Sequence, residues 1–215
     1  MLVNLNIKLQ KMERVLSEAF LVIDVQNDFC PGGALAVLEG DKIVQPINEA
    51  MDNFDLVVLT QDWHPQEHKS FASSHENKRP FDIVEMFYGD QVLWPDHCIQ
   101  GSFGANFHPD LIDEKADAII RKGSNHFVDS YSAFFENDKL KPTGLHWYLK
   151  DCEVTDLKLV GLATDFCVAF SALDAARLGY QVTVSLDMVR AIDADGSLRS
   201  AMVKMSKAGV GLVNG

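Results

Sequence analysis

Short apolar runs alternate with helix-like patterns along most of this chain. Five runs have the length of a strand, at 20–25, 56–59, 118–121, 157–162 and 182–186. Apolar residues recur three and four positions apart, as in amphipathic helices, over 41–53, 165–178 and 196–207. This alternation is typical of an open, mostly parallel α/β sheet whose strands are buried on both faces by helices. Residues 210–213 are a candidate for a sixth strand at the edge.

One long segment interrupts this alternation. Residues 61–109 are rich in His, Pro, Trp and Gly and show no sustained period of either kind. An irregular insertion of this length in a compact domain usually carries function. We therefore expect residues 19–215 to form a single domain that contains the insertion. Residues 1–18 would be a short extension before it, in which Met12 offers an alternative start.

The charge balance and the number of cysteines indicate which binding partners and which cellular compartment to expect. The chain has 19 Lys and Arg against 31 Asp and Glu, a formal net charge of −12, and its basic residues are scattered. A nucleic-acid-binding face needs clustered basic residues, and a membrane span needs about 20 consecutive apolar residues, so we expect neither partner. Four cysteines are too few and too dispersed for a disulfide framework, which favours a reducing cytoplasm.

Three chemically useful side chains follow three different strands. Asp24 lies at the end of the first apolar run, Lys122 follows the third, and Cys167 follows the fourth. Ligands of open α/β sheets bind beyond the carboxyl ends of the strands, so these side chains could meet in one cleft. Together they would supply a base, a cationic organiser and a nucleophile for acyl transfer. Taken singly, each has an ordinary alternative as a turn residue, a solvated lysine or a packed thiol.

The cysteine is expected in the first turn of a helix. Thr164 or Asp165 would cap the N-terminus of that helix, which places Cys167 near the positive end of the helix dipole. Such a position lowers the pKa of a cysteine and favours the thiolate.

The insertion contains a second cluster, in which Asp62 and His64 lie two residues apart and His97 comes from a distant loop. Carboxylate and imidazole ligands together suit Zn²⁺, Fe²⁺ or Mn²⁺. Coincidence is the alternative, because Asp-x-His alone is a weak signal, and Cys98 is an additional candidate that would more commonly be a buried thiol. Aromatic side chains near these motifs would suit a flat ring, namely Phe29, Trp94 and Tyr131.

Six linked motifs give the chain a resemblance to a known family. They occur in the order DVQNDFCPGGAL, TQDWHP with HKSFA, WPDHCIQGSFGA, RKG, DSYSAF and GLATDFCV. From residue 20 onward the chain resembles the nicotinamidases (pyrazinamidases) of the isochorismatase-like cysteine hydrolase family. The resemblance implies a six-stranded parallel sheet with helices on both faces. It also implies hydrolysis of nicotinamide to nicotinate and ammonia, which feeds NAD salvage.

The resemblance also implies roles for single positions. Asp24, Lys122 and Cys167 match the catalytic triad, with a thioester forming on Cys167. The Leu162–Ala163 bond matches a cis peptide, and the N–H groups of Ala163 and Cys167 match the oxyanion hole.

The metal and the ring have implied positions as well. Asp62, His64 and His97 match the ligands of one divalent ion, with Zn²⁺ favoured over Fe²⁺ and Mn²⁺, which would hold the pyridine nitrogen. Whether His68 is a fourth ligand stays open. The ring pocket is implied to be lined by Phe29, Trp94 and Tyr131.

Several alternatives remain at this point. The substrates implied are nicotinamide and pyrazinamide, and the protein would be a monomer or a homo-oligomer. Another amidohydrolase of the same superfamily, acting on a carbamoyl or ureido compound, would not need a metal to hold a ring nitrogen. A non-catalytic binding protein on the same scaffold is a further alternative. A redox protein using Cys167 is disfavoured because no resolving cysteine lies nearby in the sequence.

Overall fold

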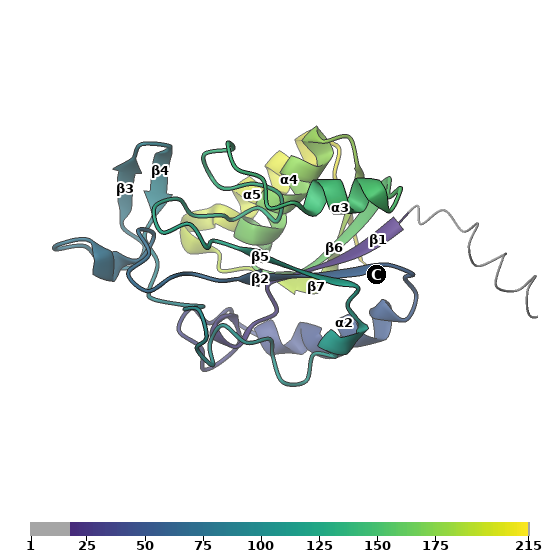
Figure 1. The fold of residues 1–215 in the computed structure, drawn as a ribbon, viewed down its shortest axis with the longest axis horizontal. Coiled ribbons are helices and arrows are strands. Elements are labelled where there is room, and N and C mark those ends of the chain that lie inside the picture. The colour runs from purple at the N-terminus through teal and green to yellow at the C-terminus, as the bar shows by residue number, and fades with distance from the viewer. Residues whose placement is uncertain (1–17, 215) are drawn as a thin grey trace, which may run out of the picture.

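The computed structural model describes residues 18–214 (Figure 1). Its main sheet has six strands in the order β5-β2-β1-β6-β7-β8, and all neighbouring strands in it are parallel. The predicted parallel sheet, with its sixth strand at the edge, is therefore confirmed. The expected extension at residues 1–18 lies outside the described residues except for its last position. The strands are Glu18–Ile23 (β1), Val57–Asp62 (β2), Ala118–Lys122 (β5), Asp156–Leu162 (β6), Gln181–Arg190 (β7) and Gly211–Val213 (β8).

Helices cover both faces of this sheet, as predicted. Figure 1 shows α2 on one side and α3, α4 and α5 on the other. Alternate residues of β1 are buried toward opposite sides, because successive side chains of a strand point in opposite directions. Phe20 belongs to the apolar cluster that includes α2, whereas Leu21 belongs to the cluster that includes the other three helices. The helices are Val44–Met51 (α2), Leu145–Asp151 (α3), Ala169–Arg177 (α4) and Ser197–Lys207 (α5).

The expectation that every strand is buried on both faces is wrong for β5. Ala118 and Ile120 pack against the core, but Ile119 on the opposite face is 48% exposed. The physical reason is that β5 is an edge strand whose second face is left uncovered.

The predicted irregular insertion contains one element that the sequence analysis did not predict. Strand β2 continues through Asp62, and the segment after it includes an antiparallel hairpin of Ile83–Met86 (β3) and Gly89–Val92 (β4). The hairpin projects from one end of the molecule (Figure 1). Its loop residues, Phe87 and Tyr88, lack the Asn-Gly or Asp-Gly signature of tight hairpins, so the sequence carries little signal. Helix α3 was also not predicted.

The chain order creates a natural binding position between β1 and β6. From β1 the sheet continues to β2 on one side, whereas β6 pairs on the other side, so the direction of winding reverses there. Gly161 allows the two strands to approach closely, since a Cβ at this residue would lie 2.1 Å from the Ile23 carbonyl oxygen. No helix within residues 18–214 has the length and apolar character needed to cross a membrane.

Candidate active site

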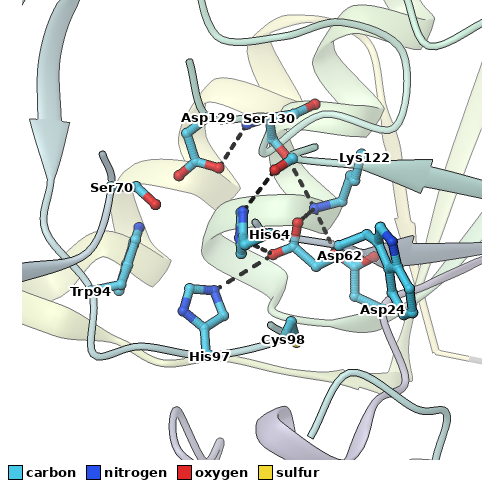
Figure 2. A network of polar contacts seen from close by, with 12 residues as sticks. Asp24, Asp62, His64, Ser70, Trp94, His97, Cys98, Lys122, Asp129 and Ser130 are labelled. Carbon is cyan, nitrogen blue, oxygen red and sulfur yellow. Dashed lines mark hydrogen bonds and ion pairs between the residues drawn. The ribbon is translucent and has the colours of Figure 1, made fainter. Parts of the chain in front are cut away.

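The buried Lys122 side chain lies at the centre of the candidate site. Its Nζ is 2.8 Å from Asp24 Oδ2 and 3.4 Å from Cys167 Sγ. The same nitrogen donates to the Ser130 carbonyl oxygen at 2.9 Å and to Asp62 Oδ1 at 3.1 Å (Figure 2). The structure thus brings together the three residues predicted from the ends of separate strands.

Asp24 follows β1 with a φ of 47°, a left-handed conformation that aspartate tolerates better than most residues. Thr60, in the middle of β2, fixes its orientation. The Asp24 N–H donates to Thr60 Oγ1 at 3.1 Å, and that hydroxyl donates to Asp24 Oδ1 at 2.6 Å. Burial raises the pKa of Asp24, and the neighbouring Lys122 ammonium opposes this rise. Thr60 was not predicted, since a threonine inside a buried strand is unremarkable.

Cys167 lies in a π-helical turn, Thr164–Val168, that leads from β6 into α4. The predicted caps are wrong, because Ala163 is the cap residue and no side chain caps the turn. The Asp165 carboxylate instead accepts hydrogen bonds from the Ile192 N–H at 3.0 Å, the Asp193 N–H at 2.8 Å and the Ser197 hydroxyl. It therefore ties the nucleophile turn to the loop after β7.

The expected thiolate is also wrong for the free protein. Burial raises the pKa of the Cys167 thiol well above its ordinary value, and the nearby Asp24 and Asp62 carboxylates raise it further. The Lys122 ammonium lowers the pKa but does not outweigh these effects. The helix dipole at the start of α4 also lowers the pKa too little to outweigh burial. Cys167 therefore rests as a thiol. The Leu162–Ala163 peptide bond is cis, as the resemblance implied.

The three candidate metal ligands meet on one side of Lys122. Asp62 Oδ2 lies 3.1 Å from His64 Nε2 and 3.5 Å from His97 Nε2, and all three side chains are buried (Figure 2). The opposite ring nitrogens lie against carbonyl oxygens, His64 Nδ1 at 2.9 Å from that of Gly123 and His97 Nδ1 at 2.8 Å from that of Pro95. A carbonyl only accepts, so each Nδ1 donates, and each Nε2 faces a carboxylate oxygen of Asp62.

Two imidazole nitrogens that face one carboxylate oxygen form a set of donor atoms suited to a divalent ion. The ligand atoms of Asp62, His64 and His97 lie within 4.8 Å of one another, and carbonyl groups orient the rings as they do at many metal centres. The residues therefore fit one divalent ion. Burial alone would lower the pKa of His64, but the Asp62 carboxylate raises it above the ordinary value. Burial alone would raise the pKa of Asp62, but His64 and Lys122 hold it well below its usual range.

His68 lies beside this group rather than in it. Its Nδ1 lies 2.7 Å from Ser70 Oγ, and its Nε2 donates to the Asn125 carbonyl oxygen at 2.7 Å, so both ring nitrogens are engaged. Burial, followed by the charge of His64, lowers the pKa of His68 to about 4. The Cys98 thiol is directed toward the carbonyl oxygen of Gly104, at 4.0 Å.

A cavity joins the candidate metal ligands to the thiol. Asp62 and His97 lie on its wall together with Ala163 and Cys167. The aromatic residues expected around a ring are all present, and Trp94 Nε1 donates to the Tyr131 hydroxyl at 3.1 Å. Four further wall residues were not predicted, although Asp129 belongs to the DSYSAF motif. The predicted aromatic residues are Phe29, Trp94 and Tyr131, and the additional wall residues are Leu35, Asp129, Phe166 and Ile192.

The fold and the site define a parallel α/β protein with a buried Asp, Lys and Cys cluster beside a group of metal-binding side chains. Residues 18–214 match the isochorismatase domain, and the chain belongs to the isochorismatase family. The nicotinamidase of Acinetobacter baylyi is 48% identical over 200 residues, which cover 93% of this chain and 94% of the relative. The resemblance inferred from the motifs is therefore confirmed.

Solved structures agree with this relationship. The nicotinamidase/pyrazinamidase of Acinetobacter baumannii has a TM-score of 0.92 and 49% identity, covering 94% of this chain and 98% of that one. The pyrazinamidase of Pyrococcus horikoshii in complex with zinc has a TM-score of 0.75 and 34% identity, with 93% of this chain and 99% of that chain covered.

Proposed function

We propose that the protein is a nicotinamidase, which hydrolyses the carboxamide of nicotinamide to nicotinate and ammonia. The observation that carries this proposal is the cavity that joins Cys167 to Asp62 and His97 between aromatic walls. A flat heteroaromatic amide matches both ends of such a cavity, with its ring nitrogen toward the histidines and its carboxamide toward the sulfur. The names and identities of the relatives support the same reaction.

The Asp24 carboxylate would accept the proton of the Cys167 thiol as the sulfur attacks the carboxamide carbon. Its raised pKa suits this role, and Lys122 would stabilise the anion that develops on the sulfur, which lies 3.4 Å from its Nζ. The N–H groups of Ala163 and Cys167 would bind the oxyanion of the tetrahedral intermediate. Asp24 would then return the proton to the departing ammonia, and water would hydrolyse the thioester on Cys167.

Asp62, His64 and His97 would hold a divalent ion, for which Zn²⁺ is favoured and Fe²⁺ or Mn²⁺ are alternatives. When bound, the ion would supply a Lewis acid that fixes the ring nitrogen and so orients the amide toward the sulfur. The zinc complex of the archaeal pyrazinamidase supports this assignment. His68 would not be a ligand, because both of its ring nitrogens are engaged elsewhere.

The aromatic side chains Phe29, Trp94 and Tyr131 would hold the ring, and the same pocket would accept pyrazinamide. Product formation would feed NAD salvage in the cytoplasm. The absence of disulfides agrees with this location, since all four cysteines are free.

Ammonia release from nicotinamide tests the proposal directly. Wild-type protein should release ammonia, and Cys167→Ala should lower the rate by at least about 10⁴-fold, because the nucleophile is removed. Nicotinate should still bind to this variant, since the ring-binding residues are intact. Cys152→Ala is the matched control, as this half-buried thiol lies outside the cavity, and it should keep the wild-type rate. Ammonia release by Cys167→Ala at the wild-type rate would exclude the mechanism, and preference for a ureido substrate would exclude the assigned reaction.

A further inference from the structure

One buried carboxylate on the cavity wall has no role in the reaction described above. Asp129 is 2% exposed and follows β5 by seven residues. Its Oδ1 accepts from the N–H of the adjacent Ser130 at 2.7 Å, and its Oδ2 accepts from Gln91 Nε2 at a long 3.3 Å. That amide nitrogen also faces the Val92 carbonyl oxygen and the Tyr131 hydroxyl, each at 2.7 Å. Among residues 18–214, Asp129 forms no ion pair with a lysine, arginine or histidine.

These contacts leave the carboxylate short of donors. A buried carboxylate is stable only when charges or several hydrogen bonds replace the water it has lost. Asp129 has one donor from its own neighbour and a share of one amide group. Both oxygens therefore keep lone pairs that can accept from a further donor in the cavity.

Asp129 lies beside His64, one of the candidate metal ligands. The potential ligand atoms of His64, His68 and Asp129 lie within 4.8 Å of one another, but Asp129 makes no direct hydrogen bond to either ring. Figure 2 shows its carboxylate on the side of His64 where Ser70 and Trp94 also lie. Direct coordination by His68 is disfavoured because its ring nitrogens are engaged.

General bond lengths give the separation that one water molecule spans between an ion and a carboxylate. A metal–oxygen bond of about 2.0–2.2 Å followed by a hydrogen bond of about 2.5–3.0 Å spans roughly 4.5–5 Å. We propose that Asp129 is a positioning residue of this centre. Its carboxylate accepts a hydrogen bond from a water molecule that completes the coordination of the ion held by Asp62, His64 and His97. This inference rests on the metal centre in the proposed function.

The β3–β4 hairpin acquires a role through Gln91. Its fully buried side chain donates to both Asp129 and Tyr131, while its Oε1 accepts from the Tyr88 hydroxyl at 3.0 Å. The hairpin thereby holds the Asp129 carboxylate and the ring-pocket tyrosine in a fixed relation. A second carboxylate near His64 also strengthens the attraction for a divalent cation.

The test is the affinity of the purified protein for Zn²⁺, measured by competition with a chromophoric chelator. Asp129→Asn should weaken Zn²⁺ binding about 10- to 100-fold, the usual effect of removing a group that hydrogen-bonds to a metal ligand. Asp174→Asn is the matched control, because this aspartate is similarly buried but pairs with Lys139 and Arg177 and does not line the cavity. It should bind Zn²⁺ within about twofold of the wild type.

Visible spectra of the Co²⁺ form distinguish a positioning residue from a direct ligand. The absorption bands of Asp129→Asn should keep the wild-type wavelengths and intensities, because the coordination number and the protein ligands are unchanged. A changed coordination number in this variant would show that Asp129 binds the ion directly and would overturn the inference. Wild-type Zn²⁺ affinity in Asp129→Asn would overturn it as well.

A second variant addresses the same question without altering the carboxylate. Gln91→Leu removes the amide donor on the projecting hairpin and should weaken Zn²⁺ binding by a smaller factor than Asp129→Asn. Unchanged affinity in a folded Gln91→Leu protein would show that the hairpin does not support the role of Asp129.

His97→Ala distinguishes a failure of the proposed metal centre from a failure of the proposed role of Asp129. If it binds Zn²⁺ as tightly as the wild type, the metal centre itself is wrong. If only His97→Ala loses affinity, the centre stands and the role of Asp129 fails.

Discussion

Lys122 links the two halves of the site through a single ammonium group. It contacts Asp24 and Cys167 on one side and Asp62 on the other, and Asp62 uses its second oxygen for the histidines. Burial alone would lower the pKa of this lysine, but the Asp24 and Asp62 carboxylates raise it well above its ordinary value. Lys122 therefore stays charged. Because it contacts both Asp62 and Cys167, a change of charge at the candidate metal centre changes the electrostatic environment of the Cys167 sulfur.

The resting state of Cys167 leads to a spectroscopic prediction. Its pKa is raised well above 9.0, chiefly by burial, so the neutral thiol should persist as the pH rises past the range where a free cysteine ionises. The absorbance at 240 nm of the wild type minus that of Cys167→Ser should stay flat up to about pH 9. The same difference measured on unfolded protein is the control, and it should show a thiolate step near pH 8.5. A step at neutral pH in the folded protein would contradict the assignment.

At the scale of elements, a glycine explains why the end of β5 accommodates the histidine. Gly123 has a φ of 67°, and a Cβ at this residue would lie 2.5 Å from His64 Cε1. Its carbonyl oxygen lies 2.9 Å from His64 Nδ1. The RKG motif thus supplies Lys122 to the triad and a close backbone contact to the metal ligand in consecutive residues.

The π-helical turn that carries Cys167 depends on Asp165, and this dependence is testable. Asp165→Ala would leave the N–H groups of Ile192 and Asp193 without their acceptor. The loss should lower the free energy of unfolding by about 1.5–3 kcal/mol, as expected for hydrogen bonds to a charged group. Denaturant unfolding measures it, and ammonia release should fall because the nucleophile turn is no longer held.

A conservative substitution provides the comparison for this turn. Asp165→Asn keeps one acceptor oxygen and should therefore lose less stability than Asp165→Ala. Equal stability of Asp165→Ala and the wild type would show that the loop after β7 is not anchored through this carboxylate.

At the scale of the whole molecule, the candidate metal ligands connect the sheet to the insertion. Asp62 is the last residue of β2, whereas His97 lies near the far end of the insertion. A bound ion would therefore tie about 35 residues of mostly irregular chain to the central sheet. Loops of this length have high conformational entropy, so closing them with a metal should stabilise the folded protein.

Calorimetry of the metal-depleted and Zn²⁺-loaded protein tests this stabilisation. At a free Zn²⁺ concentration of about 100 times Kd, binding adds roughly 2.7 kcal/mol, and for a chain of this size that corresponds to a rise in Tm of about 5–10 °C. His97→Ala should show a much smaller rise, because one ligand is missing. Equal rises in both proteins would mean that Zn²⁺ stabilises the fold from another site.

Most of the sheet and the reactive residues were predictable because they depend on local patterns. Buried strands need continuous apolar runs, so β1, β2, β6 and β7 are visible in the sequence. Side chains at the ends of parallel strands gather at one edge, which places Asp24, Lys122 and Cys167 together without knowledge of the loops. The short β3–β4 hairpin and α3 were not predicted, because their hydrophobic patterns are too short to be distinguished from the surrounding sequence.

What the tertiary structure decided concerns groups whose surroundings come from distant segments. Whether Cys167 is a thiol or a thiolate depends on burial and on charges from three strands. The thiolate predicted from its position at the start of a helix was therefore wrong. Asp165 looked like a cap, but its carboxylate binds a loop 27 residues away. The residue types and their order established the possible chemistry, whereas desolvation and long-range hydrogen bonds, which no local pattern encodes, decided how each group is used.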